Sequence, residues 1–172
     1  KALYEKGIDC NPQDRDGNTP AHAAAKEGHD SIILFLHQAK VALDTQNNDG
    51  RILAHAAAEK GQAKTIMILH KIGADLNLKD KQGNTPAHTA AYVGHTAVIT
   101  ALHEAGAHLS VKNDTGVTPA YFATQGEHVE TMKALQRAQA NLDIQTNSKH
   151  TPAHYAAQEG YTEIITILHQ AQ

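Results

Sequence analysis

Residues 83–95 read GNTPAHTAAYVGH, a stretch that holds two histidines, two threonines and a tyrosine between glycines. Its Thr-Pro-Ala-His motif, residues 85–88, recurs at residues 19–22 and at residues 151–154. Degenerate copies stand halfway between these three, at residues 52–55 and 118–121. Five evenly spaced copies without an insertion or deletion indicate a 33-residue repeat.

A leucine keeps the same register along the whole chain. It stands at Leu3, Leu36, Leu69, Leu102, Leu135 and Leu168. The chain thus begins and ends partway through a repeat, and stacked repeats need capping units over their exposed faces. We therefore expect a segment of a longer array, or one that is covered at its ends. We predict a single domain, residues 1–172, made of a partial unit 1–13 and repeats at about 14–46, 47–79, 80–112, 113–145 and 146–172, the last one incomplete.

Each repeat carries the signals of two helices joined by turns. Thr-Pro is a strong helix start, because the threonine caps the helix and proline fits its first position. The Ala-rich segment that follows ends at a glycine such as Gly94. Apolar residues at helical spacing then predict a second helix, as at Val98, Ile99 and Leu102. The polar stretch 78–84 reads as a turn that projects from the stack.

Together these features resemble the ankyrin repeat. The likeness rests on the 33-residue period, the Thr-Pro-x-His-x-Ala motif, the Gly94-His95 pair and the Gly-Ala-Asp-Leu-Asn close at residues 73–77, and it covers essentially the whole chain. The resemblance implies an all-α solenoid of stacked helix-turn-helix units with projecting β-turn or hairpin fingers. It also implies a module that binds other proteins and performs no chemistry of its own.

Composition and charge exclude several other classes. The formal charge of −3, from 15 basic and 18 acidic residues, gives no electrostatic footprint for nucleic acid or an anionic membrane. No apolar run approaches the roughly 20 residues that span a bilayer. The single Cys10 cannot form an internal disulfide, which favours a cytoplasmic location. No Cys-x-x-Cys, His-Glu-x-x-His or phosphate-binding glycine loop occurs, so we expect no enzyme activity, no cofactor and no metal.

The 13 histidines raise the question of a metal site. The resemblance implies that the motif histidine and the threonine three residues before it form hydrogen bonds within and between units. Equivalent positions in adjacent repeats lie about 8–10 Å apart, whereas the ligand atoms of one zinc ion lie within about 4 Å of one another. We therefore favour a structural role for His22, His55, His88 and His154. A third set, His29, His95 and His128, begins the second helices and matches the Gly-His pair of the resemblance, which implies a structural role for His29 and His95.

Two further histidine patterns leave alternatives open. His37, His70, His103 and His169 follow the register leucine. We favour rings half-buried at the edge of the core, and the alternative is a pH-responsive outer face. His150 and His154 have an i, i+4 spacing, but Pro152 starts a helix between them, so we expect no shared helical face.

Two units depart from the pattern in their helix signals. In the second unit Ile52-Leu53 replaces Thr-Pro, so we expect a weaker cap and a place where the array opens. In the fourth unit the glycine stands at Gly126, which leaves Glu127 in the usual glycine position.

The resemblance places the partner surface on the finger tips and on the exposed end of the first helix. The first two units carry mixed charges there, typical of a solvated face. Aromatic residues gather in units three to five, where Tyr92, Phe122 and Tyr155 are predicted anchors, although Phe122 and Tyr155 would equally fill gaps left by alanines. The predicted partner-binding residues are Tyr92, Val93, Lys81, Gln82, Asn84, Asp114, Thr115, Val117, Phe122, Gln125, Tyr155 and Gln158.

The sequence therefore predicts a monomeric scaffold that binds a protein or peptide on its concave face, without nucleic acid and without membrane insertion. An alternative is a regulatory or targeting segment of a larger multidomain protein, either an enzyme or a bacterial effector that acts on host proteins, with the catalytic part outside this chain. A third hypothesis is a metal-binding or pH-sensing array.

Overall fold

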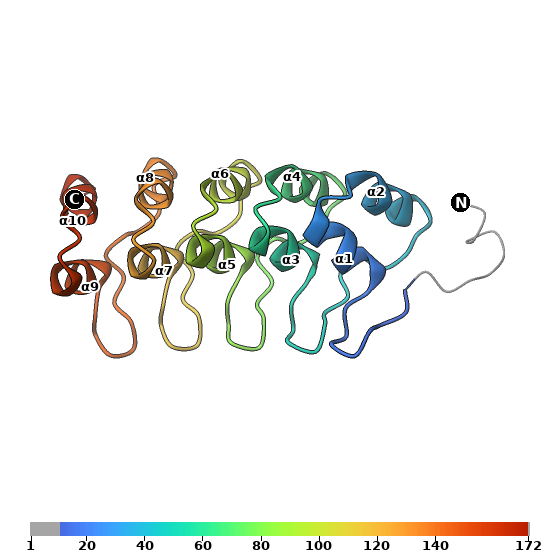
Figure 1. The fold of residues 1–172 in the computed structure, drawn as a ribbon, viewed down its shortest axis with the longest axis horizontal. Helices are drawn as coiled ribbons and strands as arrows, with labels where there is room; N and C mark the ends of the chain where they lie inside the picture. The colour runs from blue at the N-terminus through green and yellow to red at the C-terminus, as the bar shows by residue number, and fades with distance from the viewer. Residues whose placement is uncertain (1–10, 172) are drawn as a thin grey trace.

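The computed structural model describes residues 11–171, so Leu3 and Cys10 lie outside the described residues. Within this range the chain forms ten α-helices and no strand, in two layers (Figure 1). The inner layer, next to the projecting loops, consists of α1 (Pro20–Glu27), α3 (Leu53–Glu59), α5 (Pro86–Val93), α7 (Pro119–Gln125) and α9 (Pro152–Glu159). The outer layer consists of α2 (Asp30–Gln38), α4 (Ala63–Lys71), α6 (Thr96–Glu104), α8 (Val129–Arg137) and α10 (Thr162–Gln170).

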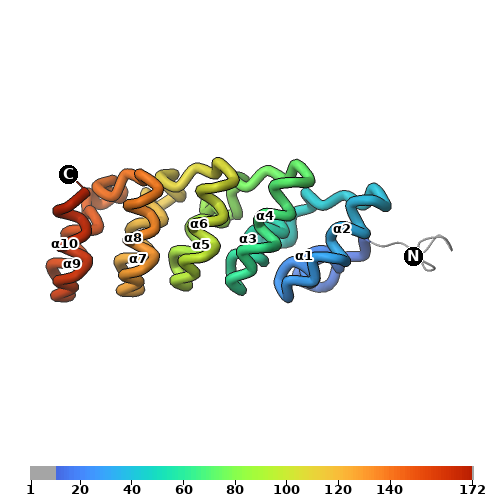
Figure 2. Tube along the Cα trace, turned by 90° about the horizontal axis from the view of Figure 1, so that it is seen from above, coloured from blue at the N-terminus to red at the C-terminus, as the bar shows by residue number. Residues whose placement is uncertain are grey.

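The helix pairs stack side by side into an elongated array. Each inner helix contacts the next inner helix, from α1 to α9, and each outer helix contacts the next outer helix. Figure 2 shows the successive pairs from above, running alongside one another from α1 and α2 to α9 and α10. The prediction of an all-α solenoid of stacked helix-turn-helix units is confirmed.

The core consists of side chains that recur once in every repeat. The inner helices contribute a fully buried alanine column, Ala24, Ala57, Ala90, Ala123 and Ala156. The outer helices contribute the register leucines from Leu36 to Leu168, none more than 9% exposed. Small side chains in the inner layer let neighbouring units approach closely, and the larger aliphatic side chains of the outer layer supply most of the apolar area removed from water.

The helix boundaries follow the signals in the sequence. Thr19, Thr85, Thr118 and Thr151 are the N-cap residues of α1, α5, α7 and α9. At the end of α7 the glycine stands one position early, at Gly126. Glu127 therefore takes the left-handed conformation (φ 53°) that a glycine adopts at this position in the other repeats. A side chain with a Cβ is strained in that region.

The projecting fingers are tight turns that bond to one another through their backbones. In the third finger the Asp80 N–H donates to the Asn84 carbonyl at 2.8 Å, which closes the turn. The Lys81 N–H donates to the Asp49 carbonyl of the preceding finger at 2.8 Å. Gly83 has φ 77°, and a Cβ built there would lie 2.7 Å from the backbone nitrogen of Asp114 in the next finger. The finger glycine thus meets two constraints, a left-handed backbone and close approach by the next finger.

The last finger within residues 11–171 meets only the first constraint, and Lys149 occupies the glycine position with φ 65°. We expect Gly83→Ala to destabilise the protein by about 2 kcal/mol, because it adds both backbone strain and a clash with Asp114. Lys149→Gly should stabilise it by about 0.5–1 kcal/mol by relieving strain alone. Urea denaturation followed by circular dichroism measures both, and equal effects of the same sign would contradict this account.

The second unit begins its inner helix without a hydroxyl cap. Ile52 and Leu53 are buried, at 4% and 1% exposure, so apolar packing takes the place of the cap. His55 Nδ1 accepts the Ile52 N–H at 3.3 Å. In the third unit His88 Nδ1 meets the Thr85 N–H at 3.0 Å and also the Thr85 hydroxyl at 2.9 Å.

Amide hydrogen exchange should therefore be faster in residues 50–60 than in the equivalent residues 83–93, by about threefold or more, because the missing cap lowers the local opening energy. Exchange measured by mass spectrometry on peptides from the two segments makes the comparison. Ile52→Thr is the matched variant, and it should slow exchange in residues 50–60 without affecting residues 83–93. Equal protection of the two segments in the unmodified chain would reject the expectation.

Candidate functional site

Three motif histidines each tie their own unit to the backbone of the next. His22 Nε2 lies 3.1 Å from the Arg51 carbonyl, His55 Nε2 lies 2.9 Å from the Asn84 carbonyl, and His88 Nε2 lies 3.1 Å from the Val117 carbonyl. In each ring Nδ1 accepts the N–H of the residue three positions earlier. The rings are therefore neutral. Each carries its proton on Nε2 and donates it to the backbone carbonyl of the next unit.

Burial keeps these rings neutral well below their ordinary titration range. It lowers the pKa of His55 to about 4 and that of His88 to about 4, even though the carbonyl bonded to each ring favours the protonated form. Burial lowers the pKa of His22 as well.

A second group of side chains holds the far ends of three inner helices, α1, α3 and α5. His95 Nε2 lies 3.1 Å from the Glu59 carbonyl and His128 Nε2 lies 3.0 Å from the Tyr92 carbonyl. In the second unit Gln62 Nε2 donates to the Lys26 carbonyl at 3.2 Å in the same way. The residue at the exposed end of the inner helix is thus fixed through its backbone by the unit that follows it.

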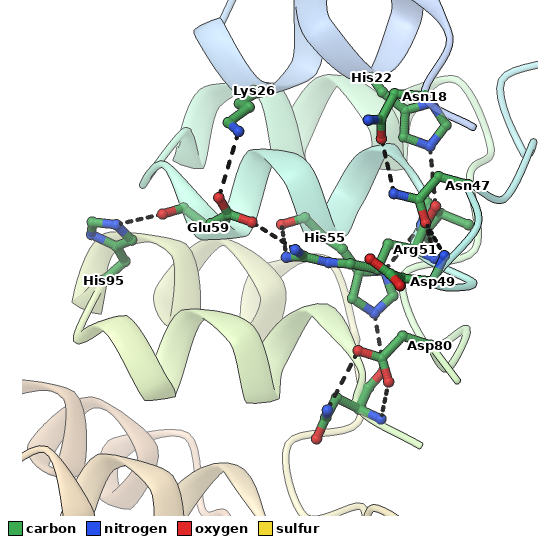
Figure 3. A network of polar contacts seen from close by, with 12 residues as sticks. Asn18, His22, Lys26, Asn47, Asp49, Arg51, His55, Glu59, Asp80 and His95 are labelled. Atoms are coloured by element: carbon green, nitrogen blue, oxygen red, sulfur yellow. Dashed lines mark hydrogen bonds and ion pairs between the residues drawn. The ribbon is translucent and has the colours of Figure 1, made fainter. Parts of the chain in front are cut away.

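The fingers and the inner helices border a hollow of about 800 Å³ over the first two units. Its floor contains Ala23 and Ala56, whose small side chains leave the space open. Charged side chains pair within this hollow. Arg51 Nη1 lies 2.7 Å from Glu59 Oε2, and Lys26 Nζ lies 3.7 Å from the other carboxylate oxygen of Glu59 (Figure 3).

A second cavity of about 350 Å³ adjoins this hollow and shares the Arg51–Glu59 pair with it. The ion pair forms one wall, and apolar side chains form the other. Tyr92 and Val93 stand at its edge, 64% and 40% exposed, and both are among the few large apolar side chains that residues 11–171 expose. The full lining is Arg51, Glu59, Asn84, His88, Thr89, Tyr92, Val93 and Phe122. Together, the hollow and this cavity are called the groove below.

A ladder of rings fixes the position of Tyr92. Its ring meets Phe122 edge to face, with centroids 5.4 Å apart and planes at 79°. Phe122 in turn meets the buried His88 ring at 6.0 Å and 82°. The ladder leads from the core to the surface, so the exposed tyrosine stands on a rigid support.

Comparison with known families agrees with this architecture. The family profile described as "Ankyrin repeats (3 copies)" matches residues 30–113 and 94–172, and the one described as "Ankyrin repeats (many copies)" matches residues 1–37. The chain belongs to the ankyrin-repeat family. Ankyrin repeats are in general protein–protein interaction modules and are typically non-catalytic scaffolds. No curated protein sequence matches this chain significantly.

Two kinds of feature are absent from the described part of this ankyrin-repeat chain. Between residues 11 and 171, none of the helices has the length and apolar character needed to cross a membrane. Over the same range, no three histidine, cysteine or acidic side chains gather as a metal site would require.

In the ankyrin-repeat structure the predicted binding residues fall into three groups. Asn84, Tyr92, Val93 and Phe122 line one cavity together. Exposed finger-tip and helix-end positions hold Lys81, Gln82, Asp114, Thr115, Gln125 and Gln158, while Val117 is half-buried beside the His88 tether. Tyr155 belongs to a separate cluster, where it meets Tyr121 at 5.9 Å and Tyr161 at 6.4 Å.

Sequence reasoning missed part of the site. It treated the charged finger-tip and helix-end residues of the first two units, which include Arg51 and Glu59, as a solvated face. These two residues are only partly exposed and form a wall shared by both cavities. It did not single out Thr89, which lines the smaller cavity. The sequence did contain a signal. The repeat position of Thr89 holds, in order along the chain, Ala23, Ala56, Thr89, Phe122 and Tyr155, and this order predicts that the groove is hollow where the side chains are small.

One expectation about histidines is wrong. His37, His70, His103 and His169 are exposed rather than half-buried. One residue turns a helix by about 100°, so the position after the buried leucine points away from the inner layer. His150 precedes α9 and shares no helical face with His154, as expected, but the turn before the helix stacks the two rings at 5.6 Å and 14°.

Acid should destabilise the ankyrin stack through its buried histidines. The folded-state pKa of about 4 for His55 and His88 lies below the ordinary 6.5, so between these values the unfolded chain binds protons that the folded chain does not. The free energy of unfolding should hold above about pH 6.5 and fall by about 2 kcal/mol per ring on reaching pH 5.

Urea denaturation at pH 7.5 and at pH 5 measures this loss. His55→Gln should reduce the difference between the two pH values by about half, whereas His37→Gln combined with His103→Gln, two exposed rings, should leave it unchanged. A pH dependence that the exposed pair removes and the buried ring does not would refute the assignment.

Proposed function

We propose that this chain is a protein-interaction scaffold that binds a partner protein or peptide in the groove between its fingers and inner helices. The observation that carries the proposal is the pair of exposed apolar side chains, Tyr92 and Val93, at the edge of one cavity of about 350 Å³. Large exposed apolar groups beside a cavity with a polar rim are typical of interaction sites.

The support beneath Tyr92 favours binding energetically. A tyrosine that is already held by Phe122 at 5.4 Å, and whose backbone carbonyl lies 3.0 Å from His128 Nε2, loses little conformational freedom when a partner covers it. Tyrosine also offers a large apolar face together with a hydroxyl, a combination enriched in binding hot spots. Lys81, Gln82, Asp114, Thr115 and Gln125 form a polar rim in this proposal.

The other predictions about the scaffold supplement this proposal. We assign no part in the central contact to Tyr155 or Gln158, because neither residue lines the cavity. Tyr155 packs with Tyr121 and Tyr161 instead. A monomer, a cytoplasmic location and a surface that does not bind nucleic acid remain predictions from charge and composition. The alternative of a regulatory or targeting segment of a larger protein also remains a prediction, tested by the sequence of the full-length gene.

The double variant Tyr92→Ala/Val93→Ala should weaken partner binding by about 30-fold, the equivalent of a hot-spot loss of about 2 kcal/mol. It should change the free energy of unfolding by less than about 1 kcal/mol, because both side chains are largely exposed. Affinity purification from cell lysates with the unmodified chain identifies candidate partners, and biolayer interferometry then measures their affinity for both forms.

Leu34→Ala is the matched control, because Leu34 is 40% exposed like Val93 but lies on the outer helix α2. It should leave partner affinity unchanged. A double variant that binds as tightly as the unmodified chain would disprove the proposal, and a large loss of stability would show that Tyr92 serves packing instead.

A further inference from the structure

The groove changes its chemistry along the stack. Over the first two units its lining carries four acidic side chains, Asp14, Asp16, Asp49 and Glu59, against two basic ones, Lys26 and Arg51. Over units three and four the lining is formed by Tyr92, Val93 and Phe122 with Asn84, His88 and Thr89, and the Arg51–Glu59 pair closes the same cavity from unit two. One half is thus net negative, and the other has an apolar wall and no net charge.

Two of the four carboxylates remain available to a basic group of a partner. Glu59 is paired with both Arg51 and Lys26. The Asp14 carboxylate accepts the N–H groups of Asp16 and Asn18 and so belongs to its own turn. Asp16 and Asp49 take part in none of the ion pairs found in residues 11–171, and they stand at equivalent positions of the first two fingers.

The dimensions of the hollow accommodate an extended segment. A volume of about 800 Å³ spread over two repeats, each about 10 Å thick, gives a mean cross-section of about 40 Å². An extended chain with one side chain turned into the groove fits this section.

We propose that the groove selects an extended peptide segment that carries an apolar, preferably aromatic, side chain and a basic side chain on the same strand. This inference rests on the proposed function and names the chemistry of its partner. The apolar side chain fills the cavity beside Tyr92, Val93 and Phe122, and the basic side chain lies against Asp16 or Asp49.

The repeat spacing sets the distance between the two side chains. Asp49 belongs to the unit before Tyr92 and Asp16 to the unit before that, so their fingers lie about 10 and about 20 Å along the stack from Tyr92. An extended chain advances about 3.3 Å per residue and its side chains alternate between two faces, so the basic residue stands about three positions from the apolar one, on the opposite face, or about six positions from it, on the same face. A helical partner would need about seven positions for the shorter distance.

Selection of a phage-displayed random 12-residue peptide library on the immobilised chain tests the proposal. Enriched sequences should pair Arg or Lys with an aromatic or large aliphatic residue three or six positions away. Enrichment of acidic residues, of no charge preference or of a seven-residue spacing would overturn it, as would the failure of any sequence to enrich.

Fluorescence polarisation with synthetic copies of the enriched peptides then assigns the contacts. Asp16→Asn/Asp49→Asn should weaken binding by about tenfold at low salt, with the difference largely lost near 1 M salt because exposed charges are screened there. The matched control Asp44→Asn/Glu104→Gln removes two exposed acidic groups outside the groove and should have no effect.

The two proposals fail in different ways. Peptides that depend on Tyr92 and Val93 but bind Asp16→Asn/Asp49→Asn normally would overturn this inference and leave the proposed function standing. Peptides or proteins that bind Tyr92→Ala/Val93→Ala normally would overturn both.

Discussion

The hydrogen bond from a buried histidine to a carbonyl of the next unit is the interaction on which the rest of the array depends. His22, His55 and His88 each make it, at 2.9–3.1 Å. The acceptor belongs to the backbone, so the side chain at that position does not affect the bond. The three acceptor residues are in fact arginine, asparagine and valine. The second set of tethers ends in the same way, on the backbones of Lys26, Glu59 and Tyr92. Both sets therefore fix the residues that line the groove while leaving their side chains free to differ. This separation lets one stacking geometry carry an ion pair in one unit and an exposed tyrosine in the next.

The depth of the groove is set by a single column on the inner helices, in which alanine, alanine, threonine, phenylalanine and tyrosine succeed one another. Small residues leave the floor hollow over the first units, and the larger rings occupy that space further along. The fourth unit shows how packing replaces hydrogen bonding when the motif histidine is absent. Tyr121 stands in its place, is buried, and meets Tyr155 edge to face at 5.9 Å. Aromatic pairs of this kind contribute about 0.5–1.5 kcal/mol beyond their buried area, comparable with the net contribution of one hydrogen bond. The substitution thus keeps neighbouring units in contact while it changes the surface between them.

Most of the fold could be predicted from the sequence, because every unit obeys the same local rules. Thr-Pro at a helix start, glycine at its end and leucine at a fixed register each have a local physical cause and recur from one repeat to the next. The site could be predicted only in part. Tyr92 and Val93 follow from register, because the exposed end of an inner helix normally carries polar residues. The wall formed by Arg51 and Glu59 does not follow, because Arg51 precedes α3 and Glu59 ends it, so helical spacing does not predict their contact at 2.7 Å. The stacked rings of His150 and His154 escaped prediction for a related reason, since helical geometry does not apply to a turn that precedes the first helical residue.

The tethering histidines of this chain belong to the scaffold, and the state of the His88 ring shows why. In His88 the lone pair of Nδ1 accepts the Thr85 N–H at 3.0 Å, and the proton of Nε2 points to the Val117 carbonyl at 3.1 Å. A metal ion or a substrate proton needs a free nitrogen lone pair, and this ring has already used its own. Burial adds a second barrier, since it lowers the pKa of the ring to about 4 and so disfavours the charged form near neutral pH. Contacts with a partner must then come from side chains whose backbone is fixed by the tethers but whose own atoms take no part in them. On the groove these are Tyr92, Val93 and the carboxylates of the first two fingers, where the backbone is fixed and the side chain remains available.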